Sequence, residues 1–124
     1  DPPYNARQYL PNYHVLETVS LYDSPPIKGV TGQRPGKSKR SPFCSKAKAL
    51  PALDELISLA QYEHIFLSYN TEGLIPVEDL CDVMRSHAAS GTFKLSKIPY
   101  RRYKNKVPNN TPGLAEVVCY IRKS

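Results

Sequence analysis

The chain opens with Asp1-Pro2-Pro3-Tyr4, four residues whose types could do chemistry on a flat nitrogen heterocycle. Two consecutive prolines fix φ and stiffen the backbone, which would hold the Pro2 carbonyl in place. Beside that carbonyl, the Asp1 carboxylate supplies a second acceptor, so the pair matches the two N–H donors of an exocyclic amine. The Tyr4 ring could stack on the heterocycle. Such a group would orient the lone pair of the amino nitrogen toward an electrophile. The alternative is an ordinary turn or a frayed terminus.

Positive charge is concentrated in two windows of the chain. Lys and Arg number 17 against 11 Asp and Glu, so the formal net charge is +6. Residues 28–48 and 94–106 hold most of the basic residues and contain no acid. This clustering suits a polyanion, with nucleic acid as the leading candidate, and a pair of solvated basic loops is the alternative.

The elements that must position these residues are short, because twelve prolines divide the chain. Apolar spacing predicts a helix over residues 12–23, with Asn12 as its N-cap, and a second over 49–61, with Pro51 in its first turn. Residues 24–45 between them are rich in Pro, Gly, Ser and basic residues, which indicates a long loop or a loosely formed hairpin.

The second half of the chain predicts strands around one further helix. The apolar run at 64–69 is typical of a buried parallel strand, and a turn follows it. A helix over 76–88 carries an apolar stripe. Strands are expected at 93–98, with Phe93 and Leu95 pointing inward, and at 115–121. This order predicts an α/β fold whose last two strands form an antiparallel pair at the sheet edge.

The three cysteines predict no disulfide framework and no metal site. Cys44, Cys81 and Cys119 are far apart and lack the short paired spacing that zinc ligands need. Cys81 and Cys119 lie in apolar patterns, so we expect them to be small core residues. The three histidines have no spacing for metal or nucleophilic chemistry, so we expect structural roles for them.

Four motifs make up a longer pattern that begins at the tetrapeptide. They are DPPYNARQYLPNYHVLE at residues 1–17, FCSK at 43–46, FLSYNTEGLIP at 66–76 and IPYRRY at 98–103. In this order and spacing the chain resembles the Dam-like class of adenine-specific (N6) DNA methyltransferases. DPPY is shared by several amino-methyltransferase classes, whereas the SYN-x-EGL-I segment is more particular to this one.

The resemblance implies an α/β fold that is the C-terminal half of a Rossmann-like methyltransferase sheet, starting at DPPY. Such an enzyme uses S-adenosylmethionine to methylate adenine in double-stranded DNA. Residues 1–124 would be one partial methyltransferase domain, with 24–48 as a basic loop or insertion within it. The strands at 64–69, 93–98 and 115–121 would be the fifth, sixth and seventh of the sheet.

The resemblance also implies roles for the opening residues. Asp1, Pro2, Pro3 and Tyr4 match the catalytic loop after the fourth strand of the family. Asp1 and the Pro2 carbonyl would hold the target amine, and Tyr4 would stack on a base flipped out of the duplex. Flipping costs a few kcal/mol, which side chains that bind phosphate help to offset.

Two further sets of residues are expected around that loop. Asn5, Tyr69 and Asn70 would line the substrate pocket, although a structural turn is the alternative for the last two. The basic side chains expected on the DNA backbone are Lys37, Lys39, Arg40, Lys46, Arg101, Arg102 and Lys104. For each of these, simple solvation accounts for the charge equally well.

The cofactor motifs of the family precede DPPY, and no G-x-G occurs in this chain, so its cofactor-binding residues are unknown. We therefore expect an upstream methyltransferase half as a partner, and neither tight cofactor binding nor methyl transfer by these residues alone. A non-catalytic nucleic-acid-binding relic and a cytosine-amine methyltransferase are the alternative functions. No apolar run approaches the roughly 20 residues that span a bilayer, so we expect a cytoplasmic bacterial protein with no membrane contact.

Overall fold

The computed structural model of the chain describes residues 1–35, 40–99 and 114–124. In chain order its elements are α1 Tyr9–Leu21, the 3-10 turn η2 Pro42–Cys44, α2 Lys46–Leu59, β1 His64–Asn70, α3 Val77–Ser86, β2 Lys94–Pro99 and β3 Ala115–Arg122. The predicted order of helices and strands is confirmed.

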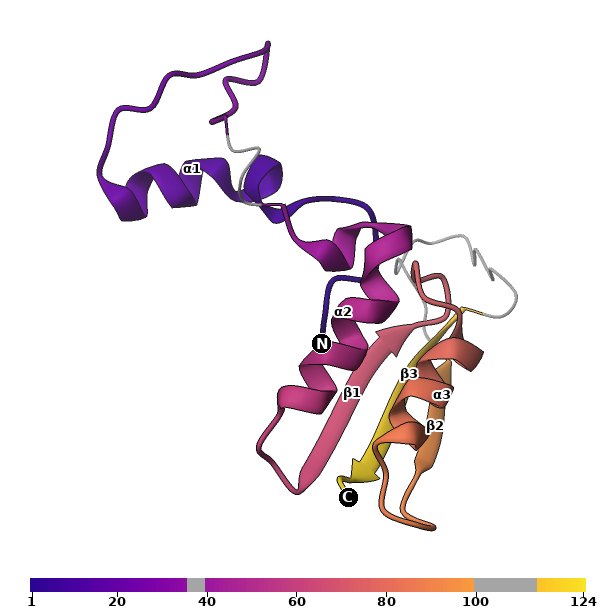
Figure 1. Ribbon diagram of the computed structural model, residues 1–124. Coiled ribbons are helices and arrows are strands. Elements are labelled where there is room, and N and C mark those ends of the chain that lie inside the picture. The colour runs from indigo at the N-terminus through magenta and orange to yellow at the C-terminus, as the bar shows by residue number, and fades with distance from the viewer. Residues whose placement is uncertain (36–39, 100–113) are drawn as a thin grey trace.

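The three strands form one antiparallel sheet in the order β1-β3-β2 (Figure 1). In the register, Cys119 of β3 lies opposite Leu67 of β1 on one side and Leu95 of β2 on the other. The predicted antiparallel pairing of the last two strands is confirmed. The parallel pairing expected for 64–69 is not seen in the described residues, because β1 pairs with β3, which runs the opposite way. A buried apolar run does not by itself distinguish the two kinds of pairing.

The core lies between the sheet and the helices α2 and α3, which pack on one face of it (Figure 1). Its largest fully buried side chains are Tyr69, Leu53, Leu80, Met84, Ile121, Val117 and Cys119. Cys81 is also buried, so the expectation that Cys81 and Cys119 are core residues is confirmed. On the opposite face Phe66 is 69% exposed and contacts the Tyr120 ring at a centroid distance of 4.8 Å.

The two core helices lie close to their predicted positions. α3 buries Leu80, Cys81 and Met84, as its apolar spacing predicts. α2 begins earlier than predicted, since the Ala49 N–H already donates to the Ser45 carbonyl at 2.8 Å. Pro51 therefore lies inside the helix and not in its first turn.

The first helix differs more from its prediction. α1 begins at Tyr9 and not after Asn12, and the preceding Gln8 makes no side-chain cap bond. Tyr13 has φ −118° and ψ 17°, which kinks the helix. Figure 1 shows α1 projecting away from the sheet, and none of its residues is buried. The apolar stripe that predicted a packed face is exposed in the structure, and its members are Val15, Leu16, Val19 and Tyr22.

The edge strand β2 and the described part of the basic segment 24–45 are both less buried than the core elements. Phe93 packs against the core, and Leu95 of β2 lies opposite buried Cys119, so both point to the core face as predicted. Leu95 is nevertheless 37% exposed, because it lies on the edge strand. α3 packs mainly on the central strand β3, which leaves side chains of the edge strand less covered. In the 24–45 segment Lys28 and Gln33 exchange two backbone hydrogen bonds of 2.8 Å, which form a short hairpin. None of the described helices is both long and apolar enough to cross a membrane.

Candidate active site

Tyr4, the last residue of the opening tetrapeptide, is held at the carboxyl end of β1, whereas Asp1, Pro2 and Pro3 lie alongside the strand. In the turn after that strand, the Leu74 N–H donates to the Tyr4 carbonyl at 2.9 Å. Asp1, Pro2 and Pro3 line a cavity of about 430 Å³ together with residues of α2 and β1. Figure 1 shows this N-terminal segment running in the direction of β1. The carboxyl end of a strand is where open α/β sheets place their ligands.

The turn that holds Tyr4 is fixed mainly by Asn70. The Asn70 Oδ1 accepts the Glu72 N–H at 2.8 Å, and the Asn70 carbonyl accepts the Gly73 N–H at 2.9 Å. The Asn70 Nδ2 donates to the Glu116 Oε1 at 3.2 Å, which ties the turn to β3. An asparagine that bonds the backbone two residues ahead is the usual stabiliser of such turns. The side chain of Asn70 is therefore engaged within the fold.

Tyr69 joins this turn to the core. Its ring is 1% exposed, and its hydroxyl accepts the Ile75 N–H at 3.2 Å. Burial raises the pKa of Tyr69 above its usual value, while backbone hydrogen bonds from the turn act in the opposite direction. Gly73 lies so close to the Tyr69 ring that a Cβ at that position would come within 2.6 Å of the ring Cζ. Only glycine can approach the ring so closely.

Tyr4 is the exposed partner of that buried ring. The two rings meet edge to face, with centroids 6.4 Å apart and planes at 85°. Tyr4 itself is 41% exposed and borders a cavity of about 230 Å³. The same cavity is lined by Pro3, Asn5, Arg7, Tyr9, Asn12 and Tyr13. The Tyr4 ring thus contacts the buried Tyr69 ring on one side and borders an open cavity.

The predicted site residues are brought together only in part. Tyr4 and Asn5 share the smaller cavity, and Asp1 and Pro2 line the larger one, with Pro3 bordering both. Asn5 also accepts the Arg7 N–H on its Oδ1 at 2.9 Å. Tyr69 and Asn70 lie directly beneath this region, where both are buried. Their predicted place in a substrate pocket remains a prediction.

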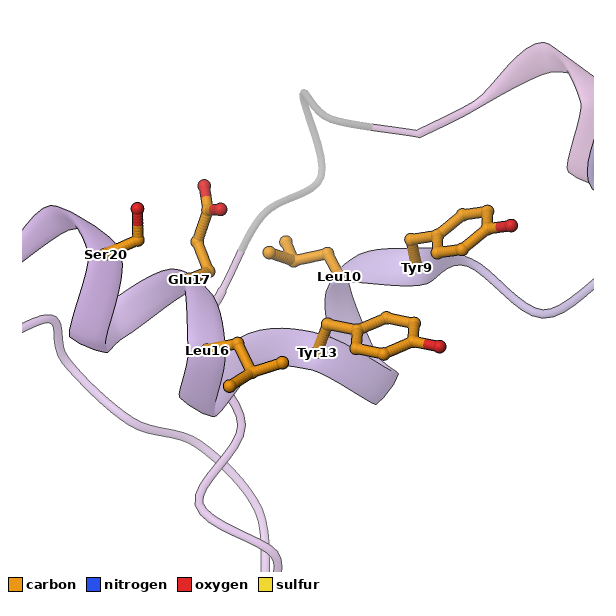
Figure 2. Close-up of a pocket in the computed structure, with 6 residues that line it drawn as sticks. All are labelled: Tyr9, Leu10, Tyr13, Leu16, Glu17 and Ser20. Carbon is orange, nitrogen blue, oxygen red and sulfur yellow. The ribbon is translucent and has the colours of Figure 1, made fainter.

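Sequence reasoning missed the contribution of α1 to this region. Tyr9 and Tyr13 stack at a centroid distance of 5.7 Å with planes 20° apart, and both rings face the Tyr4 cavity. Figure 2 shows the two rings side by side at one end of a second pocket, of about 410 Å³, whose described lining comes from α1 alone. The four-residue spacing of the two tyrosines would have indicated this pairing, because residues i and i+4 share a helix face.

The basic residues predicted to contact DNA are only partly described. Arg40 is exposed just before η2, and Lys46 is exposed as the first residue of α2. The other five lie outside the described residues and are Lys37, Lys39, Arg101, Arg102 and Lys104. Among the described residues, no cluster of three or more His, Cys, Asp or Glu side chains could hold a metal ion.

The donor set around the tetrapeptide does not fit S-adenosylmethionine on its own. Apart from Asp1 and His64, the cavity beside β1 has apolar or aromatic walls, including Phe43, Leu53 and Tyr62. No Lys or Arg among the described residues lines it, so the carboxylate of an amino-acid moiety would lack a cationic partner there. The described residues therefore make no complete site for that cofactor.

Comparison with known proteins gives one consistent result. Residues 1–83 match the family model of D12 class N6 adenine-specific DNA methyltransferases. The chain is 44% identical over 123 residues to Type II methyltransferase M.FokI of Planomicrobium okeanokoites and 40% identical over 123 residues to Modification methylase StsI of Streptococcus sanguinis. Each alignment covers 99% of this chain but 19% of the relative.

A third relative is Type II methyltransferase M.NlaIII of Neisseria lactamica, 44% identical over 104 residues, which are 84% of this chain and 30% of the relative. The chain thus spans about a fifth to a third of the length of these curated relatives. No solved structure matches it.

Proposed function

The chain belongs to the D12 class of N6 adenine-specific DNA methyltransferases, and we propose that it carries the base-binding catalytic loop of such an enzyme. In this proposal the complete enzyme would methylate the exocyclic amine of an adenine turned out of duplex DNA, with S-adenosylmethionine as the methyl donor. The cofactor supplies an electrophilic methyl group when bound. β1, β2 and β3 would then be the fifth, sixth and seventh strands of a Rossmann-like sheet. Further strands would lie beyond the edge of β1 that no strand of the described residues pairs with.

The observation that carries the proposal is the way in which the turn after β1 and the Tyr69 ring hold Tyr4 in place. Its backbone is bonded to the turn after β1, and its ring rests edge-on against a buried tyrosine while facing an open cavity. A base stacked on such a ring gains about 1–3 kcal/mol, which helps to offset the cost of leaving the duplex. Asn5, Tyr69 and Asn70 would shape and support the pocket around that base.

Asp1 and Pro2 would act on the amine itself. The carboxylate of Asp1 and the carbonyl of Pro2 each accept one N–H, which leaves the nitrogen lone pair free to attack. Pro2 and Pro3 keep the carbonyl from turning away, because their φ angles are fixed. The contribution of these residues is therefore to position the base and its amine.

The test uses a complete methyltransferase that contains these residues, labelled cofactor and duplex DNA. Asp1→Ala should abolish methyl transfer while DNA affinity changes little, and Tyr4→Ala should lower both the rate and the fluorescence of a 2-aminopurine placed at the target position. Nucleoside analysis of the product distinguishes adenine from cytosine methylation. DNA binding without any methyl transfer by the unsubstituted protein would favour the non-catalytic relic and refute the proposal.

A further inference from the structure

A polar cavity of about 500 Å³ lies between the segment that follows the tetrapeptide and the start of α2. Gln8, Arg40, Ser41, Ser45 and Lys48 provide its polar side chains. No acidic residue is among the described residues that line it. The cavity is therefore suited to an anion and not to a cation.

Three hydrogen bonds connect the wall of this cavity to Arg7 and Gln8, in the segment that follows the tetrapeptide. The Ser41 N–H donates to the Gln8 Oε1 at 2.8 Å, and the Gln8 Nε2 donates back to the Ser41 carbonyl at 3.5 Å. The thiol of Cys44, which is buried, donates to the Arg7 carbonyl at 3.2 Å. The cavity is thus held at a fixed place a few residues beyond Tyr4.

Its two cations carry no counter-charge within the described residues. Neither Arg40 nor Lys48 is ion-paired there, whereas Arg34 of the same basic window is held by both carboxylate oxygens of Asp23 at 2.6 Å. Ser45 precedes α2 but makes no side-chain cap bond, so its hydroxyl is available to a ligand. A guanidinium, an ammonium and a hydroxyl around one cavity are donors that match the oxygens of a phosphate.

We propose that this cavity binds a single phosphodiester group of the DNA strand that carries the target base, an inference that rests on the proposed function. α2 runs opposite to β1, so the start of α2 lies at the end of the sheet where Tyr4 is held (Figure 1). One phosphate fixed there would set the position of the backbone next to the flipped nucleotide. Phosphate contacts of this kind position the protein on DNA without reading its sequence.

The experiment measures binding of the full chain to a short fluorescein-labelled duplex by anisotropy, over a series of salt concentrations. Each neutralised phosphate contributes a slope of about 0.9 to log K against log salt. Because Arg40 and Lys48 would share one phosphate, the double variant R40Q/K48Q should lower the slope by about 0.9. Ser45→Ala should weaken binding with little change in slope.

Three matched variants test whether the change in slope belongs to this cavity. Lys28→Gln removes a charge from the same window but outside the cavity, so its slope should not change. The charge-conserving variants Arg40→Lys and Lys48→Arg should keep the slope and show that the fold is intact. An unchanged slope in R40Q/K48Q, or a fall of about 1.8 that indicates two separate phosphates, would overturn the proposal.

A third arm distinguishes DNA from a free phosphate ligand. Inorganic phosphate added at constant ionic strength should leave the amide resonances of Ser45 and Lys48 unshifted at concentrations where the duplex shifts them. Saturable shifts with inorganic phosphate alone would assign the cavity to a free ligand. The outcome is separable from that of the proposed function: a slope change here, together with no methyl transfer by the complete methyltransferase, would retain the phosphate site and reject the enzyme.

Discussion

Replacing Gly73 by alanine should destabilise the fold by about 2–4 kcal/mol, through one contact. The new Cβ would lie within 2.6 Å of the Tyr69 Cζ and 2.8 Å of its hydroxyl oxygen, whereas non-bonded carbons rest at about 3.5–4.0 Å. The Tyr69 ring is 1% exposed and has little room to withdraw. Overpacking of this kind costs about 1–3 kcal/mol, and loss of the Ile75 hydrogen bond to the hydroxyl adds about 1 kcal/mol.

The measurement is urea unfolding of the chain, followed by circular dichroism, in a double-mutant cycle with Tyr69→Leu. Leucine removes the ring atoms that the new methyl group would meet, so Gly73→Ala should cost little in that background. Gly73 does not have a positive φ, and backbone strain therefore contributes nothing to the expected loss. A loss below about 0.5 kcal/mol for Gly73→Ala, or an equal loss with and without the Tyr69 ring, would refute this reasoning.

Two further predictions concern buried polar groups. Tyr69→Phe keeps the ring but leaves the Ile75 N–H without its acceptor, so urea unfolding should show a loss of about 1–3 kcal/mol with an unchanged circular dichroism spectrum. Burial, reinforced by neighbouring Cys81, raises the pKa of Cys119 from 9.0 to about 12. The unfolded chain then loses this proton at a lower pH than the folded chain, so the stabilisation is complete below about pH 9 and declines as the pH rises toward 12. In Cys119→Ala the urea midpoint should fall less between pH 9 and pH 12 than it does in the unsubstituted protein. An identical fall in both proteins would contradict a raised pKa of Cys119 as its cause.

The sequence predicted those elements whose apolar faces meet a partner within the described chain. The stripe of α3 was predicted correctly because Leu80 and Met84 pack on the sheet. The start of α2 was predicted less than one turn too late, because Pro51 was placed in the first turn of the helix. The stripe of α1 has the same helical spacing, yet Val19 is 68% exposed. Periodicity reports which side chains share a face, but it carries no information on what lies opposite that face.

The site prediction rests on the chemistry of the residue types, and the structure bears only on where those residues lie. The residue types of the tetrapeptide indicated two acceptors and a stacking ring, and Tyr4 does lie at the end of a strand. The support beneath it was not foreseen, although the two-residue period of a strand puts Tyr69 on the same face as buried Leu67. The Asn70 contact with the Glu72 N–H is the kind of local bond that such a turn signals. The close approach of Gly73 to the Tyr69 ring depends on the path of the whole turn, so the sequence pattern could not predict it.

Stability and site geometry are coupled at the end of β1, and this decides how the catalytic proposal can be tested. Tyr69 belongs to the core and also bonds the turn that holds Tyr4, so any change there lowers stability together with activity. Tyr4 is 41% exposed, and its link to the turn is through its backbone carbonyl, which every side chain retains. Tyr4→Leu should therefore remove the stacking surface at little cost in unfolding free energy. A complete methyltransferase that loses methyl transfer with this variant while its urea midpoint is unchanged would separate the proposed base-binding role of Tyr4 from the structural role of Tyr69.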